Sequence, residues 1–103
     1  MFTARAVALA TGSVPVVPAV PGLADARPWG TREATAAASV PPRLVVLGGG
    51  VAGLELATAF SSLGSHVTVL SRGALLEQEE PFAGGLVADA LATEGVDLSL
   101  IHI

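Results

Sequence analysis

Three glycines at a fixed spacing are the residues of this chain best suited to hold phosphate. They are Gly48, Gly50 and Gly53, in the segment VVLGGGVAGLE that begins at Val45. In this pattern the first glycine permits a tight turn, the second lets a pyrophosphate approach the backbone, and the third lets a helix pack closely on a strand. The free amides at the start of that helix, from Val51 onward, and its positive dipole end attract phosphates. The spacing predicts a dinucleotide site; the alternative is a glycine-rich turn that binds nothing.

Ser71 and Arg72 indicate which dinucleotide the site takes. Sites for NAD place Asp or Glu about 20 residues beyond the glycines, where the carboxylate binds the ribose 2′-hydroxyl. Here Ser71-Arg72 stands at that place. A hydroxyl can bond a 2′-phosphate, and a guanidinium can pair with it and stack on the adenine, so NADP is favoured. The alternatives are NAD as the cofactor and Arg72 as a solvated turn residue, because three acidic residues follow: Glu77, Glu79 and Glu80.

The apolar pattern supplies the strand and helix that such a loop must join. Leu44–Leu47 is a continuous apolar run bounded by glycine, which is typical of a parallel strand buried on both faces. Strands and helices alternate from there on, which implies right-handed crossovers and a parallel sheet with helices on its faces. We therefore predict an α/β fold, a Rossmann-like βαβ nucleotide-binding unit. Its further elements are a helix at Val51–Leu63 that Gly64 ends, a strand at His66–Leu70, and a helix from Phe82 to Leu91 that follows Pro81 and stops at Gly95.

Residues 1–42 carry weaker signals. Ala6–Ala10 predicts a short buried strand. Glycines and prolines recur through Thr11–Pro28, where they fix backbone angles and remove hydrogen-bond donors, so we expect an extended connector. Thr31–Ser39 is rich in alanine and predicts a helix that ends before Pro41-Pro42.

Composition and charge limit the classes of function. Hydrophobic residues make up 51% and charged residues 14% of the 103 residues, which is too apolar for a disordered chain. The formal net charge of -4 includes no basic block, so nucleic acid is not an expected partner. Without cysteine the chain can form no disulfide, thiolate nucleophile or zinc–thiolate site, and we expect no metal site. Glycine and proline interrupt every apolar run, so we expect a soluble protein without a targeting or membrane segment. The absence of cysteine fits the expectation of a cytoplasmic protein.

Three stretches of the sequence carry a family resemblance. They are VALATGSVPVVPAVPG, LVVLGGGVAGLELATAFSSLGSHVTVLSRG and EEPFAGGLVADALATEGVDL, which together span nearly the whole chain. They resemble the pyridine nucleotide-disulfide oxidoreductases, the family that contains dihydrolipoyl dehydrogenase and mercuric reductase. The resemblance implies that Thr11 and Gly12 belong to an FAD-binding domain, with their backbone by the flavin nucleotide. It also implies that Glu55 lies near the nicotinamide and the flavin; the alternative is a first-turn glutamate that complements the helix dipole. The Ser71-Arg72 ending most resembles the NADPH-using, mercuric reductase-like branch.

Members of that family are several times longer than this chain. A complete member begins with its own FAD-binding glycine motif and a redox-active cysteine pair, and ends with a dimerisation domain that supplies a catalytic histidine. The chain therefore resembles an internal fragment that contains none of the catalytic residues of the family. In this interpretation residues 1–30 are the end of the FAD-binding domain with a proline-rich connector. Residues 31–97 are the first half of the NAD(P)-binding Rossmann domain, and residues 98–103 are a non-native read-through tail.

The segment Leu98–Ile103 differs in composition from the rest of the chain. It holds both isoleucines and one of the two histidines, His102, and its residue types suit AT-rich codons in an otherwise GC-rich composition. We interpret it as read-through of a sequencing adapter; the alternative is an ordinary strand after Gly95. His102 is consequently a poor candidate ligand, and we expect His66, at the start of a strand, to be a surface or packing residue.

The resemblance implies a segment of an FAD-dependent oxidoreductase that binds NAD(P)H and transfers hydride between the nicotinamide and the flavin, and on to a disulfide or another acceptor. The intact parent is expected to be a homodimeric enzyme, and the isolated chain to be inactive. Two alternatives stay open: a stand-alone dinucleotide-binding module without catalysis, and a differently built Rossmann dehydrogenase. The Ala10-Thr11-Gly12 and proline preamble argues against the last, since such an enzyme needs no flavin-domain strand before its glycine loop.

Overall fold

The computed structural model describes residues 1–101 and divides the chain into two units, Met1–Gly30 and Thr31–Ile103. In residues 1–30, all of them described, there is no helix and no strand, and the only regular feature is a series of turns over 21–26. The predicted strand at Ala6–Ala10 is therefore wrong, and those residues are exposed. A strand needs hydrogen-bonded neighbours, and residues 1–30 contain no second strand that could supply them.

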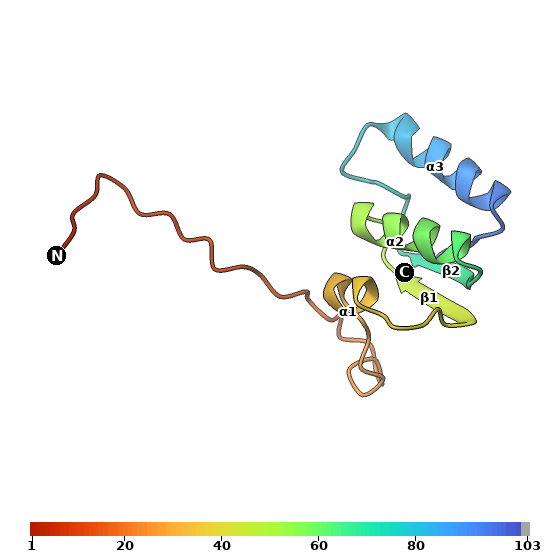
Figure 1. Ribbon diagram of the computed structural model, residues 1–103. Coiled ribbons are helices and arrows are strands. Elements are labelled where there is room, and N and C mark those ends of the chain that lie inside the picture. Colours follow the sequence, from red (N-terminus) through yellow and green to blue (C-terminus); the bar gives the residue numbers. More distant parts are fainter. Residues whose placement is uncertain (102–103) are drawn as a thin grey trace. The chain divides into compact units, whose positions relative to one another are not determined.

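The second unit has the predicted α/β fold with a parallel sheet (Figure 1). Its sheet has three strands in the order β1-β2-β3, and both neighbouring pairs are parallel. The predicted strand-helix-strand-helix alternation is thus confirmed, and β3 contains Leu98. His102 and Ile103 lie outside the described residues. The elements are α1 (Thr31–Thr35), β1 (Arg43–Leu47), α2 (Val51–Ser62), β2 (His66–Ser71), α3 (Pro81–Thr93) and β3 (Asp97–Leu100).

The two long helices end at the predicted glycines. Gly64 and Gly95 have φ angles of +99° and +85°, in the left-handed region that favours glycine. After α2, the Gly64 amide donates to the Ser61 carbonyl at 3.0 Å and the Ser65 amide to the Phe60 carbonyl at 2.9 Å. This pair of bonds is the Schellman pattern, which satisfies the last carbonyls of a helix and turns the chain back toward the sheet. The amides that follow α3 form the same pattern.

Helix α1 is shorter than the sequence predicts. We expected Thr31–Ser39, but the helix ends at Thr35, whose hydroxyl donates to the Thr31 carbonyl at 2.8 Å. None of its residues is buried. Short helices depend on a packed face for their stability, so a segment that buries so little does not extend to Ser39.

The hydrophobic core lies on one face of the sheet. Alternate residues of β2, Val67 and Val69, are each 1% exposed and belong to the same core as residues of α2 and α3. On β1 the neighbouring residue Val46 is partly buried, whereas Val45 is 58% exposed. The prediction that β1 is buried on both faces is therefore wrong, because no helix in the described part of the chain covers the second face. The core residues are Leu54, Ala57, Phe60, Val67, Val69, Leu75, Leu91 and Val96.

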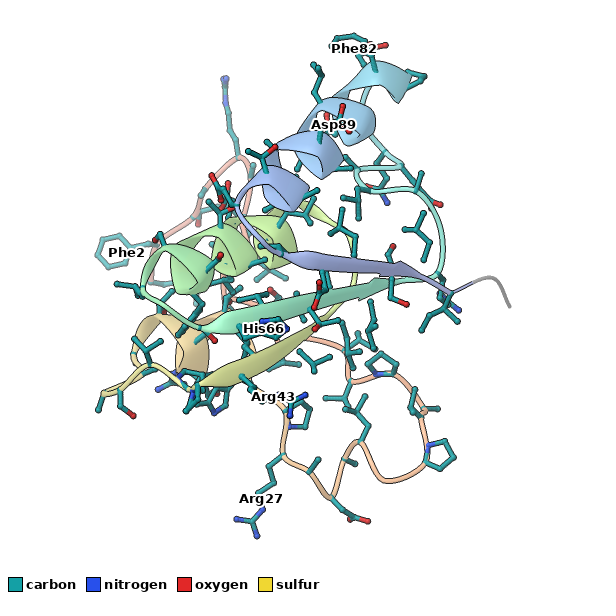
Figure 2. The ribbon with its side chains drawn as sticks, turned by 90° about the vertical axis from the view of Figure 1, so that its right-hand side faces the viewer. Phe2, Arg27, Arg43, His66, Phe82 and Asp89 are labelled. Carbon is teal, nitrogen blue, oxygen red and sulfur yellow. The ribbon has the colours of Figure 1, made fainter. Side chains whose placement is uncertain are left out.

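His66 lies at the surface, at the start of β2. The parallel register places it beside Arg43, where β1 begins, and Figure 2 shows both side chains on neighbouring strands. Its Nε2 atom is 2.9 Å from Oδ2 of Asp97 on β3, and both side chains are exposed. The glycine segment follows the opposite end of β1, so His66 is remote from the predicted phosphate site. Among residues 1–101, no helix combines the length and the apolar character needed to cross a membrane.

Because the core covers only one face of the sheet, the same substitution on the two faces should have unequal effects on stability. Val69→Ala removes buried methyl groups and leaves a cavity, so it should lower the free energy of unfolding by about 2–3 kcal/mol. Val45→Ala acts on the exposed face and should change it by less than about 0.5 kcal/mol. Urea denaturation of the purified chain, followed by circular dichroism, measures both. Equal losses in the two variants would contradict the assignment of an uncovered second face.

Candidate functional site

The site begins with a tight turn at the carboxyl end of β1. Gly48 has a φ of +111°, a value that a residue with a side chain rarely adopts. Its amide donates to the carbonyl of Leu70 at 2.8 Å, which ties the turn to the neighbouring strand β2. Because β1 and β2 are parallel, their carboxyl ends meet at this edge of the sheet. In open parallel sheets that edge is where ligands bind.

Gly53 lets helix α2 approach the turn. A Cβ atom on Gly53 would lie 2.7 Å from the carbonyl oxygen of Gly48 and 3.2 Å from Cγ1 of Val46. The first distance is shorter than real Cβ contacts, and a backbone carbonyl cannot move aside as a flexible side chain can. The helix therefore sits on the end of β1 only because residue 53 has no side chain, in the role that the sequence predicts for it.

The amino end of α2 presents unpaired amides toward open space. Gly50 is its N-cap residue and provides no side-chain cap, and the first turn contains no acidic residue. The helical bonding begins with the amide of Leu54, which donates to the Gly50 carbonyl at 3.1 Å, so the preceding amides have no helical acceptor. A Cβ on Gly50 would meet no atom within 4 Å. The space above these amides is thus free for an anion, which the positive end of the helix attracts.

A pocket of about 270 Å³ opens in front of these amides. Pockets that enclose whole drug-sized ligands are larger, roughly 300–1,000 Å³, so this pocket has room for part of a dinucleotide. It lies between the turn formed by Gly48, Gly49 and Gly50, here called the glycine turn, and the segment that leads from β2 to α3. Its lining residues are Gly49, Gly50, Val51, Ala74, Leu76, Glu77, Gln78 and Glu79.

Gly49 has a structural role that the phosphate motif does not predict. A Cβ at this position would lie 2.8 Å from both Cδ2 of Leu75 and Oγ of Ser71. The Gly49 carbonyl accepts a hydrogen bond from the amide of Leu76 at 2.9 Å. The segment between β2 and α3, which lines the other side of the pocket, is therefore hydrogen-bonded directly to the glycine turn. The phosphate motif accepts any residue between its first two glycines. A third glycine at that middle position was therefore the signal in the sequence that Gly49 has a role of its own.

Gly84 lets helix α3 pack closely against the same segment from its other side. A Cβ on Gly84 would overlap the backbone carbonyl oxygen of Leu75, and Gly84 is buried in the first turn of α3. Leu75 itself is buried in the core. The segment between β2 and α3 is thus clamped between the glycine turn and α3. A glycine pair inside a predicted helix was the signal, since glycine there normally costs about 1 kcal/mol relative to alanine.

The two residues that the sequence assigns to the 2′-phosphate lie in different environments. Ser71 is buried, with its hydroxyl beneath Gly49. Arg72 is exposed, and no ion pair involves its guanidinium within residues 1–101. The charged group is therefore accessible to a ligand. The role of each in binding a phosphate stays a prediction.

Glu55 and the Thr11-Gly12 pair complete the predicted site residues. Glu55 is exposed on α2, which begins at Val51, so it lies beyond the first turn. Its alternative interpretation as a first-turn glutamate that complements the helix dipole is therefore wrong, since that effect fades beyond the first turn. Thr11 and Gly12 belong to the first unit, where both are exposed. Their proximity to a flavin, and that of Glu55 to the nicotinamide, stay predictions.

Comparison with known proteins gives a consistent result along the chain. A family model for pyridine nucleotide-disulphide oxidoreductases matches residues 1–102. Mercuric reductase from Acidithiobacillus ferrooxidans is 46% identical over 90 residues, which are 87% of this chain and 16% of that protein. Dihydrolipoyl dehydrogenase from Mycoplasma pneumoniae is 39% identical over 102 residues, 94% of this chain and 22% of that protein. The chain thus spans less than a quarter of the length of these relatives.

Solved structures of longer proteins also contain a part that resembles this chain. The HOCl-induced flavoprotein disulfide reductase RclA from Escherichia coli, in its Cu(II) complex, has a TM-score of 0.77 and 34% sequence identity. That likeness covers 87% of this chain and 21% of the RclA chain. The complex of putidaredoxin reductase with putidaredoxin matches over 59% of this chain, with a TM-score of 0.55.

The geometry predicts unequal losses of stability for alanine at two of the glycines. Gly53→Ala forces Cβ against the Gly48 carbonyl, at a cost of about 1–3 kcal/mol that the better helix propensity of alanine, about 1 kcal/mol, offsets only in part. Gly50→Ala places Cβ in open space at an extended backbone angle, and should change stability by less than about 1 kcal/mol. Urea denaturation compares the two variants. A Gly53→Ala protein as stable as the unmodified chain would contradict the close approach of α2.

Proposed function

The chain belongs to the pyridine nucleotide-disulphide oxidoreductase family, and we propose that its second unit binds NAD(P)H for an FAD-dependent enzyme. In this proposal residues 31–97 are the first half of the NAD(P)-binding domain. Residues 1–30 are the end of the FAD-binding domain and its connector. The matched relatives are oxidoreductases by name, mercuric reductase and dihydrolipoyl dehydrogenase.

The observation that carries the proposal is the uncapped amino end of α2. Its free amides face a pocket, no carboxylate of the first turn competes for them, and the absent side chain of Gly50 leaves room for a phosphate. A side chain at Gly50 would fill that room. The donors, the positive helix end and the open cradle therefore suit the pyrophosphate of a dinucleotide.

The predicted site residues have different roles in this proposal. Gly48 and Gly53 shape the turn, while Gly50 and Val51 present their backbone to the pyrophosphate. Arg72, with the Ser71 hydroxyl, favours the 2′-phosphate of NADPH, with NADH as the alternative cofactor. Glu55 on α2 is placed toward the nicotinamide and the flavin. In the first unit, the backbone of Thr11 and Gly12 lies by the flavin nucleotide.

The whole protein is, in this proposal, a homodimeric cytoplasmic oxidoreductase. A bound nicotinamide nucleotide supplies or accepts the hydride that passes to or from the flavin. The contribution of this segment is to hold and orient the nucleotide, because without cysteine it carries no disulfide of its own. The final acceptor is a disulfide or another oxidant.

Nucleotide titration tests the binding role and the choice of cofactor. Isothermal titration of the purified chain should show saturable binding of both NADPH and NADH. Arg72→Ala should weaken NADPH binding by about tenfold, because a charge-assisted bond to the 2′-phosphate is lost, and NADH binding by less than about twofold. Gly50→Ala should weaken both nucleotides alike, since it fills the space of the shared pyrophosphate. Equal effects of Arg72→Ala on both nucleotides would remove the 2′-phosphate role.

The same assignment predicts little flavin chemistry in the isolated chain. Only the Thr11-Gly12 corner of the proposed flavin site lies within these residues. Purified protein should therefore carry no tightly bound FAD and show no NAD(P)H-dependent dye reduction. An absorption spectrum and a diaphorase assay measure the two properties. Yellow protein with turnover would contradict the assignment of residues 1–30.

A further inference from the structure

The carboxylate of Glu77 lies close to the end of strand β2. Its Oε1 atom lies over Gly73, at the place where a side chain on that residue would stand. Glu77 also lines the pocket, together with Gly49, Gly50 and Val51. The carboxylate thus lies beside Gly73, just past the end of β2, although the sequence places Glu77 well beyond the strand.

The path of the intervening residues explains this position. Leu75 is anchored in the core, and Gly49 and Gly84 leave the space that it occupies. Leu76 then adopts a φ of 54°, unusual for a residue with a side chain, while its amide bonds to the Gly49 carbonyl at 2.9 Å. This turn directs the chain back toward β2. The position of Glu77 therefore follows from contacts of the fold.

We propose that Glu77 is a specificity-determining residue of the nucleotide site, which accepts a hydrogen bond from the 2′-hydroxyl of the adenosine ribose and opposes a 2′-phosphate. The inference rests on the proposed nucleotide-binding function and deepens it. Dinucleotide sites for NAD have a carboxylate at the end of the second strand for that bond. Here β2 ends at Ser71 and Arg72 follows, and Glu77 supplies the carboxylate from the segment after them.

Arg72 and Glu77 then act in opposite directions on the same atoms of the ligand. The guanidinium attracts a 2′-phosphate and gains little from a hydroxyl, whereas the carboxylate repels the phosphate and bonds the hydroxyl. With one group of each sign at the ribose, discrimination between NADPH and NADH is weaker than Arg72 alone would give. Removing the negative charge of Glu77 should shift the preference toward the phosphorylated nucleotide.

Two small probes isolate this part of the site, namely 5′-AMP and 2′,5′-ADP, which differ only in the 2′-phosphate. In isothermal titrations of the 103-residue chain, Glu77→Gln should strengthen 2′,5′-ADP binding about fivefold and weaken 5′-AMP binding about twofold. Opposite signs are the distinguishing result, because a general loss of negative charge would strengthen both anions. Glu80→Gln is the matched control: it makes the same change at the N-cap of α3, outside the pocket lining, and should alter both affinities by less than about twofold.

Gly73→Ala provides a second test that keeps the charge. Its φ lies outside the left-handed region, so alanine fits the backbone, and the new Cβ displaces the Glu77 carboxylate. The ratio of the two probe affinities should shift in the same direction as in Glu77→Gln. If Arg72→Ala weakens 2′,5′-ADP but Glu77→Gln behaves as Glu80→Gln does, the inference fails and the proposed function stands. If the unmodified chain binds neither probe nor NAD(P)H, both fail.

Discussion

The contact between Gly53 and the carbonyl of Gly48 is the constraint on which the rest of the site depends. It seats helix α2 on the end of β1 at a separation that no side chain would permit. The seating brings the unpaired amides of α2 to the carboxyl edge of the parallel sheet, and the bond from the Gly48 amide to the Leu70 carbonyl fixes the turn there. The free amides that the proposed phosphate site requires are thus positioned by packing, without any charged side chain among them.

A second set of close contacts builds the pocket wall that faces these amides. Leu75 fills the space left by Gly49 and Gly84, and the amide of Leu76 bonds to the glycine turn. The segment between β2 and α3 is therefore joined both to the turn and to α3. The same contacts bring the Glu77 carboxylate over Gly73, close to the end of β2, even though Glu77 is distant from the glycine motif in sequence.

The sequence predicts the features that depend on local pattern. The glycine spacing, the helix stops at Gly64 and Gly95 and the strand-helix alternation are local, and the structure confirms the elements they predict. The strand at Ala6–Ala10, the length of α1 and the burial of β1 on both faces depend on neighbours outside the local pattern, and these predictions were wrong. The positions of Gly49 and Glu77 follow from a buried leucine and a backbone bond across the pocket, which no spacing rule encodes.

The most direct test of the account asks which amides respond to a nucleotide. An isotope-labelled sample of the chain, titrated with NADPH and followed by two-dimensional nitrogen–proton NMR, reports every backbone amide separately. If the nucleotide binds at the amino end of α2, the largest saturable shifts fall on the amides from Gly50 to Gly53. Shifts that leave these amides unchanged, or that gather at the opposite end of the sheet around His66, would contradict this site.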